Sequence, residues 1–138
     1  MHIAQLFADV NWLAVLAALV AAFVLGGAWY SNALFGKAWM QDVGLTEEAV
    51  KNANMVKTFG GTIILEAIAA IALSAFIGRD ATWLEGLHTG LWVGLLWIAS
   101  AYGITYLFEQ RSLRLWLINA GYYVVLYAIM GIIIGAMN

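Results

Sequence analysis

Four long stretches of the sequence are almost free of charged residues, and this pattern constrains the fold more than any other feature. Residues 10–36, 86–108 and 115–138 contain no Asp, Glu, Lys or Arg, and Glu66 is the single one between residues 58 and 78. Each stretch exceeds the ~20 apolar residues that a helix needs to cross the hydrocarbon core of a bilayer. We therefore expect an all-α membrane protein whose four transmembrane helices lie at about residues 10–34, 58–78, 82–108 and 113–137.

Composition supports a single integral membrane domain over residues 1–138. With 64% hydrophobic and 10% charged residues, little remains for a soluble domain once four helices are removed. Strands of a membrane barrel alternate in polarity over ~10 residues, whereas the run 63–69 does not alternate. Signal peptides begin with basic residues, and residues 1–10 contain no Lys or Arg, so we expect the first helix to be retained. The chain has no cysteine for disulfides or thiol catalysis and no basic cluster for nucleic acid.

Short connections and internal similarity predict how the helices pair. Residues 109–112 join the third and fourth helices so closely that we expect an antiparallel hairpin. Residues 60–68 resemble residues 121–129, which suggests that the first two helices form a second, related hairpin. The alternative is that these matches between apolar residues arise by chance.

Two sequence motifs predict helix starts in the loops. Thr46 and Glu47 combine a capping hydroxyl with an acid at the positive end of the helix dipole. We therefore expect a short interfacial helix between the first two membrane helices, ending near Met55. Thr82 and Glu85 have the spacing of a capping box, which predicts the start of the third membrane helix.

Basic residues set the expected orientation. Five of the six Lys and Arg residues follow the first and third helices, and only Arg79 follows the second. Basic loops stay on the cytoplasmic side of the membrane. We therefore expect those two connections to be cytoplasmic and both termini to lie outside, in the periplasm or the extracellular space. The five residues are Lys37, Lys51, Lys57, Arg111 and Arg114.

Small residues recur at four-residue intervals on three of the helices. Such stripes let helix backbones approach closely in lipid. There are more small faces than one four-helix bundle obviously needs, so we expect a homo-oligomer. The alternative is that all of them pack within one subunit. The stripes are Gly86, Gly90 and Gly94, then Gly131 and Gly135, and on the first helix Ala14, Ala18, Ala22 and Gly26.

Glu66 is the main candidate for a functional residue. It lies ~12 Å from the inner end of its helix, and an intramembrane carboxyl group marks a functional site by default because it is costly to bury. We expect it to face the bundle, to be protonated because low dielectric disfavours the charged form, and to bond a Tyr hydroxyl or Asn119. The site is either a proton- or cation-binding site or a neutral carboxyl group that ties helices together. The other expected members are Thr62, Ser74, Asn119, Tyr123, Tyr127 and His88.

His88 lies roughly 9 Å from Glu66 along the membrane normal, and Ser74 and Tyr127 are placed to bridge the two. We expect either a pH-sensitive gate or ligand or a hydrogen-bonded interfacial residue. No His and Glu cluster has the spacing of a metal site, no glycine-rich loop has the context of a phosphate site, and no nucleophile and base are paired. We therefore expect no metal and no cofactor.

Several motifs near the cytoplasmic edge carry a resemblance to a known family. The chain resembles the bacterial membrane family catalogued as domain of unknown function 1761, over nearly its whole length. The resemblance implies a small four-helix protein of the bacterial inner membrane and no established activity. The chain departs from the family pattern at Asn32, where members often have Pro, and at Tyr123, where they often have His. The motifs are Gly-Ala-Trp-Tyr-Ser at 27–31, Leu-Phe-Gly-Lys-Ala-Trp-Met at 34–40, Tyr-Leu-Phe-Glu at 106–109, Arg-Ser-Leu at 111–113 and Ile-Asn-Ala-Gly-Tyr at 118–122.

These motifs place a polar cluster at the inner mouth of the bundle. Lys37, Glu109, Arg111 and Asn119 are expected to lie close together there, where they would contact an anionic headgroup or a ligand. In the structural alternative, Glu109 pairs with Lys37 or Arg111 and Asn119 caps a helix end.

Three classes of function remain open. The first is a transporter or channel for a proton, a small cation or a small solute through Glu66. The second is a non-catalytic scaffold or accessory subunit, and the third is a small membrane enzyme that resembles four-helix trimeric transferases in size alone. We rank transport first. The expected partners are the lipid bilayer, further copies of the chain, and a proton or small solute, without nucleic acid.

Overall fold

The computed structural model describes residues 2–138, and all regular secondary structure in that part of the chain is helical. Four segments are long and apolar enough to cross a membrane, so the expectation of an all-α protein with four such helices is confirmed. They are α2 (Trp12–Trp29), α5 (Met55–Ile77), α8 (Leu113–Ala136) and the continuous segment Trp83–Glu109, which consists of α6 (Trp83–Trp92), the π-helix η1 (Val93–Ile98) and α7 (Ala99–Glu109). The short helices are α1 (Ile3–Ala8), α3 (Gly36–Val43) and α4 (Glu47–Lys51).

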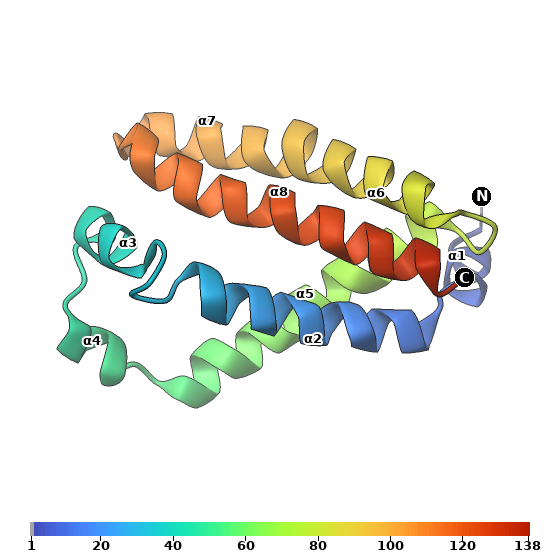
Figure 1. Ribbon diagram of the computed structural model, residues 1–138, viewed down its shortest axis with the longest axis horizontal. Helices are drawn as coiled ribbons and strands as arrows, with labels where there is room; N and C mark the ends of the chain where they lie inside the picture. The colour runs from blue at the N-terminus through green and yellow to red at the C-terminus, as the bar shows by residue number, and fades with distance from the viewer. Residues whose placement is uncertain (1) are drawn as a thin grey trace.

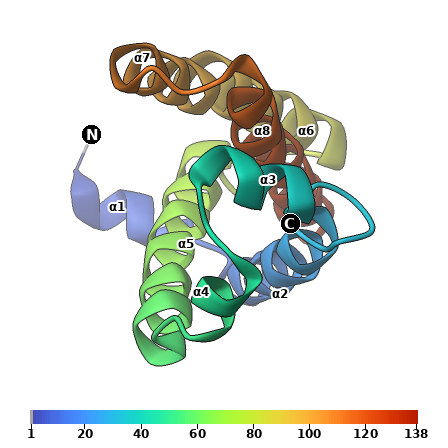
Figure 2. The same ribbon diagram turned by 90° about the vertical axis from the view of Figure 1, so that its left-hand side faces the viewer.

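Helix α8 lies at the centre of the bundle. It packs most extensively against α6 and also contacts α2, η1, α7, α5 and α3. Figure 2 shows α6 and α7 on one side of α8 and α2 on the other. Leu115, Leu126, Met130 and Ile134 of this helix are each at most 2% exposed and form much of the core. Because α2 contacts α8 as well as α5, the two helix pairs are not separate units, and their origin as two hairpins stays a prediction.

Glycines bring the backbones of α6 and α8 into direct contact. A methyl group at Gly86 would overlap the backbone of Gly131, and one at Gly90 would overlap the carbonyl of Tyr127. Gly135 is likewise covered by the backbone at Thr82. The alanine stripe of α2 is buried inside the bundle as well. The small-residue faces thus pack within one subunit, and the homo-oligomer stays a prediction.

Helix α2 ends at Trp29, five residues before the end expected from the apolar run. The Ser31 hydroxyl donates to the Ala28 carbonyl at 2.7 Å, which competes with continuation of the helix. Gly36 then packs directly on the carbonyl groups of Tyr30 and Ser31, where a side chain would not fit. The chain therefore turns back and forms α3 in a region where no helix was expected.

The loop between α2 and α5 contains the second short helix, α4. It begins after Thr46, whose hydroxyl accepts from the Ala49 amide at 3.1 Å, so the start is where the sequence predicts it. It ends at Lys51, four residues before Met55, which instead begins α5. The position of α4 at a membrane surface stays a prediction. Helix α1, before α2, was not expected from the sequence.

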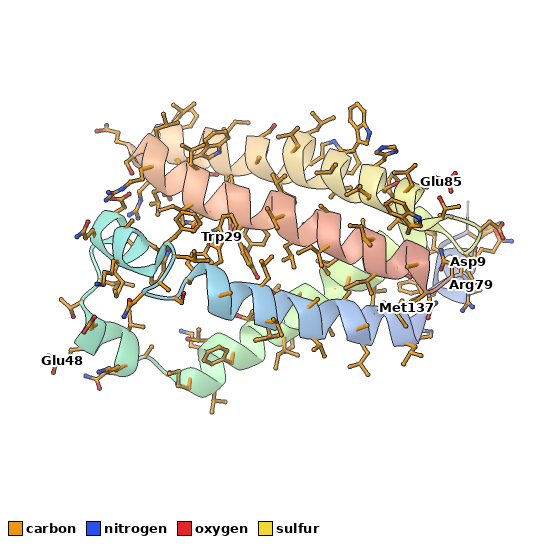
Figure 3. All side chains as sticks on the ribbon, viewed as in Figure 1. Asp9, Trp29, Glu48, Arg79, Glu85 and Met137 are labelled. Carbon is orange, nitrogen blue, oxygen red and sulfur yellow. The ribbon has the colours of Figure 1, made fainter. Side chains whose placement is uncertain are left out.

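Both termini lie at one end of the bundle, which we call the terminal end, and α3 and α4 lie at the other, the loop end (Figure 1). Hydrogen bonds tie the terminal end together: the backbone N–H of Asn11 donates to Ser74 Oγ at 3.1 Å, and Arg79 Nη2 donates to the Val10 carbonyl at 2.9 Å. The Asn11 side chain also donates to the Met137 carbonyl at 2.8 Å. Arg79 and Met137 are labelled at this end in Figure 3. The expected capping box between Thr82 and Glu85, which starts α6, is present there too.

Helix α5 leaves the bundle toward the loop end. It packs against α2 and touches α8 and α6, but it forms no extensive contact with α7 in the described chain. Figure 2 shows α5 and α7 separated on the side that faces the viewer. This divergence leaves space beside the middle of α5, where Glu66 lies.

Candidate functional site

A cavity of about 600 Å³ lies between α5 and the rest of the bundle in its loop-end half. We call it the Glu66 chamber, after the single charged residue in its wall. Eight of its fifteen lining residues are aromatic, which sets it apart from an aqueous pore lined by polar groups. Its lining residues are Ala22, Phe23, Gly26, Gly27 and Tyr30 from α2 and its C-cap, Trp39 from α3, Thr58, Phe59, Thr62 and Glu66 from α5, Tyr102 and Tyr106 from α7, and Asn119, Tyr122 and Tyr123 from α8.

Glu66 lies halfway along α5, eleven residues from each end of the helix. Its Oε2 atom is buried and has no hydrogen-bond partner, and no other buried side-chain nitrogen or oxygen within residues 2–138 lacks one. The Tyr122 hydroxyl lies beside this carboxyl group. That hydroxyl donates to the Ala22 carbonyl at 3.2 Å. A hydroxyl has one proton to donate, so Tyr122 does not also donate to Glu66, and Oε2 is left without a donor.

Asn119 organises the loop-end side of the chamber. Tyr30 Oη donates to Asn119 Oδ1 at 2.7 Å, and Asn119 Nδ2 donates to Tyr106 Oη at 2.7 Å. These two bonds join the end of α2, α8 and α7 across the chamber wall. The Asn119 amide group is hydrogen-bonded to these two tyrosines. It therefore neither bonds Glu66 nor caps a helix end, as two of the expectations had it.

Aromatic rings form a continuous wall on one side of the chamber. The Tyr102 and Tyr123 rings stack with centroids 5.3 Å apart, and Tyr123 meets Tyr122 at 5.1 Å. Tyr122 contacts Tyr30 at 5.3 Å, and Tyr30 meets the edge of Trp39 at 5.7 Å. Each ring is held by its neighbour, so the wall needs little reordering to receive a ligand.

The π-helix η1 directs α7 toward the chamber. Its i→i+5 turn is wider than an α-helical turn, so it rotates the following helix about its axis. Gly86 and Gly90 before η1 face α8 closely, and Tyr102 and Tyr106 after it line the chamber. Isolated π turns of this kind are frequent at functional sites.

A second cavity of about 270 Å³ lies between α3 and α4. We call it the antechamber. It shares Tyr30 and Trp39 with the Glu66 chamber, so this ring pair separates the two spaces. The antechamber is also lined by Glu47 and Lys51, both exposed at the loop end. The antechamber thus connects two charged residues at the surface with the aromatic wall.

Three residues expected at the site lie elsewhere. Ser74 is 1% exposed and accepts from the Asn11 amide at the terminal end. Tyr127 lines a separate small cavity further along α5, toward the terminal end, and His88 is exposed on α6. The expected bridge from Glu66 to His88 through Ser74 and Tyr127 is therefore not formed. Thr62 does line the chamber, although its hydroxyl donates to the Thr58 carbonyl at 2.6 Å.

The polar cluster expected at the inner mouth is only partly assembled. Glu109 and Arg111 form an exposed ion pair at 3.5 Å. Lys37, on α3, forms no ion pair with any residue that the structure describes. Asn119 lies in the chamber wall instead. A lipid headgroup or ligand site at these residues stays a prediction.

Sequence reasoning missed the best-formed ion pair in the chain. Arg114, near the start of α8, binds Asp42 of α3 through Nη2 and Oδ1 at 2.6 Å and through Nε and Oδ2 at 2.8 Å. Ser112 Oγ also donates to this carboxylate at 3.2 Å. The Arg114 hydrogen bonds hold the pKa of Asp42 below its ordinary value. No local pattern relates residues 72 positions apart, so only the fold reveals the pair.

Trp29 fixes the end of α2 against α8. Its indole Nε1 donates to the Ile118 carbonyl at 3.0 Å (Figure 3). Trp116 makes a similar bond from α8 to the Ala99 carbonyl at 2.9 Å. Both tryptophans thus connect neighbouring helices.

Comparison with known proteins identifies one family. The family model described as Protein of unknown function (DUF1761) matches residues 13–135, nearly the whole chain. No curated protein and no solved structure matches the chain significantly. The comparison thus supports the resemblance noted in the sequence motifs and supplies no activity.

Proposed function

Because the chain belongs to the DUF1761 family, whose description assigns no activity, we propose a function from the Glu66 chamber: the protein moves protons, small cations or small solutes across the bacterial inner membrane. The observation that carries this proposal is the buried, unpartnered oxygen of Glu66 beside a cavity of about 600 Å³. A buried polar atom without a partner costs ~1–3 kcal/mol. A proton or a cation bound at Glu66 offsets that cost.

Access to the chamber from one side supports a transport cycle. In the terminal-end half the helices pack through buried side chains, each at most 3% exposed, among them Ala70, Leu73, Met130 and Ile134. The loop-end half contains the chamber and the antechamber. A site that opens to one side in a given state is the arrangement that alternating access requires.

Charge supports the assignment of sides. The basic residues Lys37, Lys51 and Arg111 lie on or beside α3, α4 and the connection from α7 to α8, all of which are at the loop end (Figure 1). By the positive-inside rule this end is cytoplasmic. The chamber then opens toward the cytoplasm, and both termini lie outside. A homo-oligomer is compatible with this proposal but is not needed for it.

Proton flux in liposomes tests the proposal. We expect wild-type protein to dissipate an imposed pH gradient faster than protein-free liposomes, and Glu66→Gln to abolish the difference. Glu48→Gln is the matched control, because Glu48 is exposed on α4 (Figure 3) and lines neither cavity. Circular dichroism and gel filtration verify that both variants are folded.

Two outcomes would refute transport through Glu66. One is wild-type flux no faster than that of empty liposomes, for protons and for potassium alike. The other is flux that Glu66→Gln leaves unchanged. Either result would favour the scaffold or accessory-subunit alternative.

A further inference from the structure

The wall of the Glu66 chamber indicates which class of cation it accommodates. A metal ion is held by several oxygen or nitrogen ligands at ~2.0–2.6 Å. The chamber offers one carboxylate, and the Asn119 amide is already bonded to Tyr30 and Tyr106. Most of the remaining lining of the chamber consists of aromatic and other apolar groups. A bare metal ion would lose its hydration shell there without replacement.

Aromatic faces instead suit cations that carry their charge on a large apolar surface. Tyr and Trp rings attract ammonium groups within ~6 Å of the ring centroid, and cages of such rings bind quaternary ammonium ligands. Tyr102, Tyr123 and Tyr122 form neighbouring ring contacts at 5.1–5.3 Å along the chamber wall that Glu66 shares. A ligand between the carboxylate and these rings has both parts of the required chemistry.

Size and charge agree with this class. The cavity of about 600 Å³ falls within the ~300–1,000 Å³ typical of small-molecule sites. Glu66 is the single formal charge in the wall, so a monocation leaves the complex neutral. A dication would leave one positive charge uncompensated inside the membrane, which is costly.

Two routes of entry fit an amphipathic ligand. Helices α5 and α7 form no extensive contact, and both expose apolar side chains such as Ile63 and Ile104, which suit passage from the lipid. The antechamber approaches from the loop end and reaches the chamber at the Tyr30 and Trp39 ring pair.

Resting on the proposed function, we infer that the ligand of the Glu66 chamber is an organic monocation, an ammonium group with apolar substituents, which binds in exchange for one proton. The exchange is balanced: the Glu66 carboxyl group releases its one proton to water, and the resulting carboxylate forms an ion pair with the cation. The other titratable groups that face the chamber or Glu66 are tyrosines, which are neutral near pH 7. They are Tyr30, Tyr102, Tyr106, Tyr122, Tyr123 and Tyr127.

Calorimetric titration of the protein in lipid nanodiscs with benzyltrimethylammonium tests the inference. Neopentylbenzene, its neutral carbon analogue, has the same shape and no charge. We expect the cation to bind at least tenfold more tightly than the neutral analogue, and potassium to compete with neither. Titrations in buffers of different ionisation enthalpy should register one proton released per cation bound. Affinity should rise with pH, because fewer protons then compete for Glu66.

Variants separate the carboxylate from the rings. Glu66→Gln should weaken cation binding at least tenfold and abolish proton release. Tyr102→Leu removes a ring face and should weaken binding about fivefold to tenfold. Tyr102→Phe keeps the ring and should bind within about twofold of wild type. Equal losses in Tyr102→Leu and Tyr102→Phe would contradict a role for the ring face.

The results distinguish failure of the inference from failure of the proposed function. Glu66-dependent proton flux together with equal affinity for the cation and its neutral analogue would overturn the organic-cation assignment and leave transport standing. Proton-coupled cation binding together with flux that Glu66→Gln leaves unchanged would support the ligand class and refute transport through Glu66. Binding of the cation without proton release would refute the exchange.

Discussion

Replacement of Gly90 by alanine tests the packing on which the whole bundle depends. A Cβ atom at this position would overlap the backbone carbonyl of Tyr127 on α8. Because the obstacle is backbone, no side-chain rotation can relieve it. An apolar carbon and a carbonyl oxygen approach no closer than ~3.3 Å, so α6 and α8 must separate by roughly 1 Å. That displacement loosens the most extensive helix contact in the structure.

The expected cost follows from two opposing effects. Overpacking of a close contact costs ~1–3 kcal/mol, and a backbone obstacle places Gly90→Ala near the upper limit. Alanine in a helix interior gains ~1 kcal/mol over glycine. The net effect is a loss of about 2 kcal/mol in the free energy of unfolding. Gly61→Ala is the matched control, because Gly61 is also inside a membrane helix and a methyl group there meets nothing within 4 Å.

Unfolding by sodium dodecyl sulfate, followed by far-ultraviolet circular dichroism, measures both variants. We expect Gly61→Ala to be as stable as wild type or more stable, and Gly90→Ala to lie about 3 kcal/mol below Gly61→Ala. If the two variants have the same stability, α6 and α8 do not meet at their backbones, and the reasoning is wrong.

Three further predictions concern the loop end and the π-helix. Asp42→Asn should remove the stabilisation that the ion pair with Arg114 provides, which the lowered pKa of Asp42 reflects. In the wild type this stabilisation is present above the ordinary Asp pKa of ~3.9 and is lost as the pH falls through the lowered pKa. The stability of the variant, measured by acid unfolding, should therefore depend less on pH. Deletion of Leu96 should convert η1 to α-helix and rotate the tyrosines of α7 away from the chamber. Calorimetry should then show a lower cation affinity, and circular dichroism should show that the protein is still folded. Tyr30→Phe should leave Asn119 Oδ1 without its donor and lower the thermal unfolding temperature, at a cost of ~1–2 kcal/mol; an unchanged temperature would argue against that bond.

The distribution of charge was sufficient to predict the membrane helices but not where α2 ends. Residues 30–35 carry no charge, so hydropathy extends the helix through them. The turn arises because Gly36 packs on the backbone of Tyr30 and Ser31, a contact that composition does not encode. Helix α3 and the π-helix η1 escaped prediction for the same reason.

The sequence predicted how far along its helix each site residue lies, but not which other side chains it meets. Counting residues along each helix placed Glu66, Asn119 and Tyr123 near one level, helix periodicity placed Thr62 on the same face as Glu66, and all four line the chamber. Tyr127 was expected to bridge Glu66 and His88, but it lines another cavity, because spacing along a helix does not determine which side chains of other helices it meets. Tyr30, Trp39 and Tyr106 were overlooked, since aromatic residues near a membrane boundary are normally read as anchors.

The hydrogen bonds at the terminal end make that end a pivot. Hydrogen bonds of Asn11, Ser74 and Arg79 hold the C-terminal end of α5 against its neighbours. The N-terminal end of α5 forms no extensive contact with α7. Helix α5 has 23 residues and is therefore a lever ~35 Å long. A rotation of α5 by about 10° about its hydrogen-bonded end would move its N-terminal end by ~6 Å. A hinge motion of α5 about the terminal end would therefore widen or narrow the Glu66 chamber while that end stays in place.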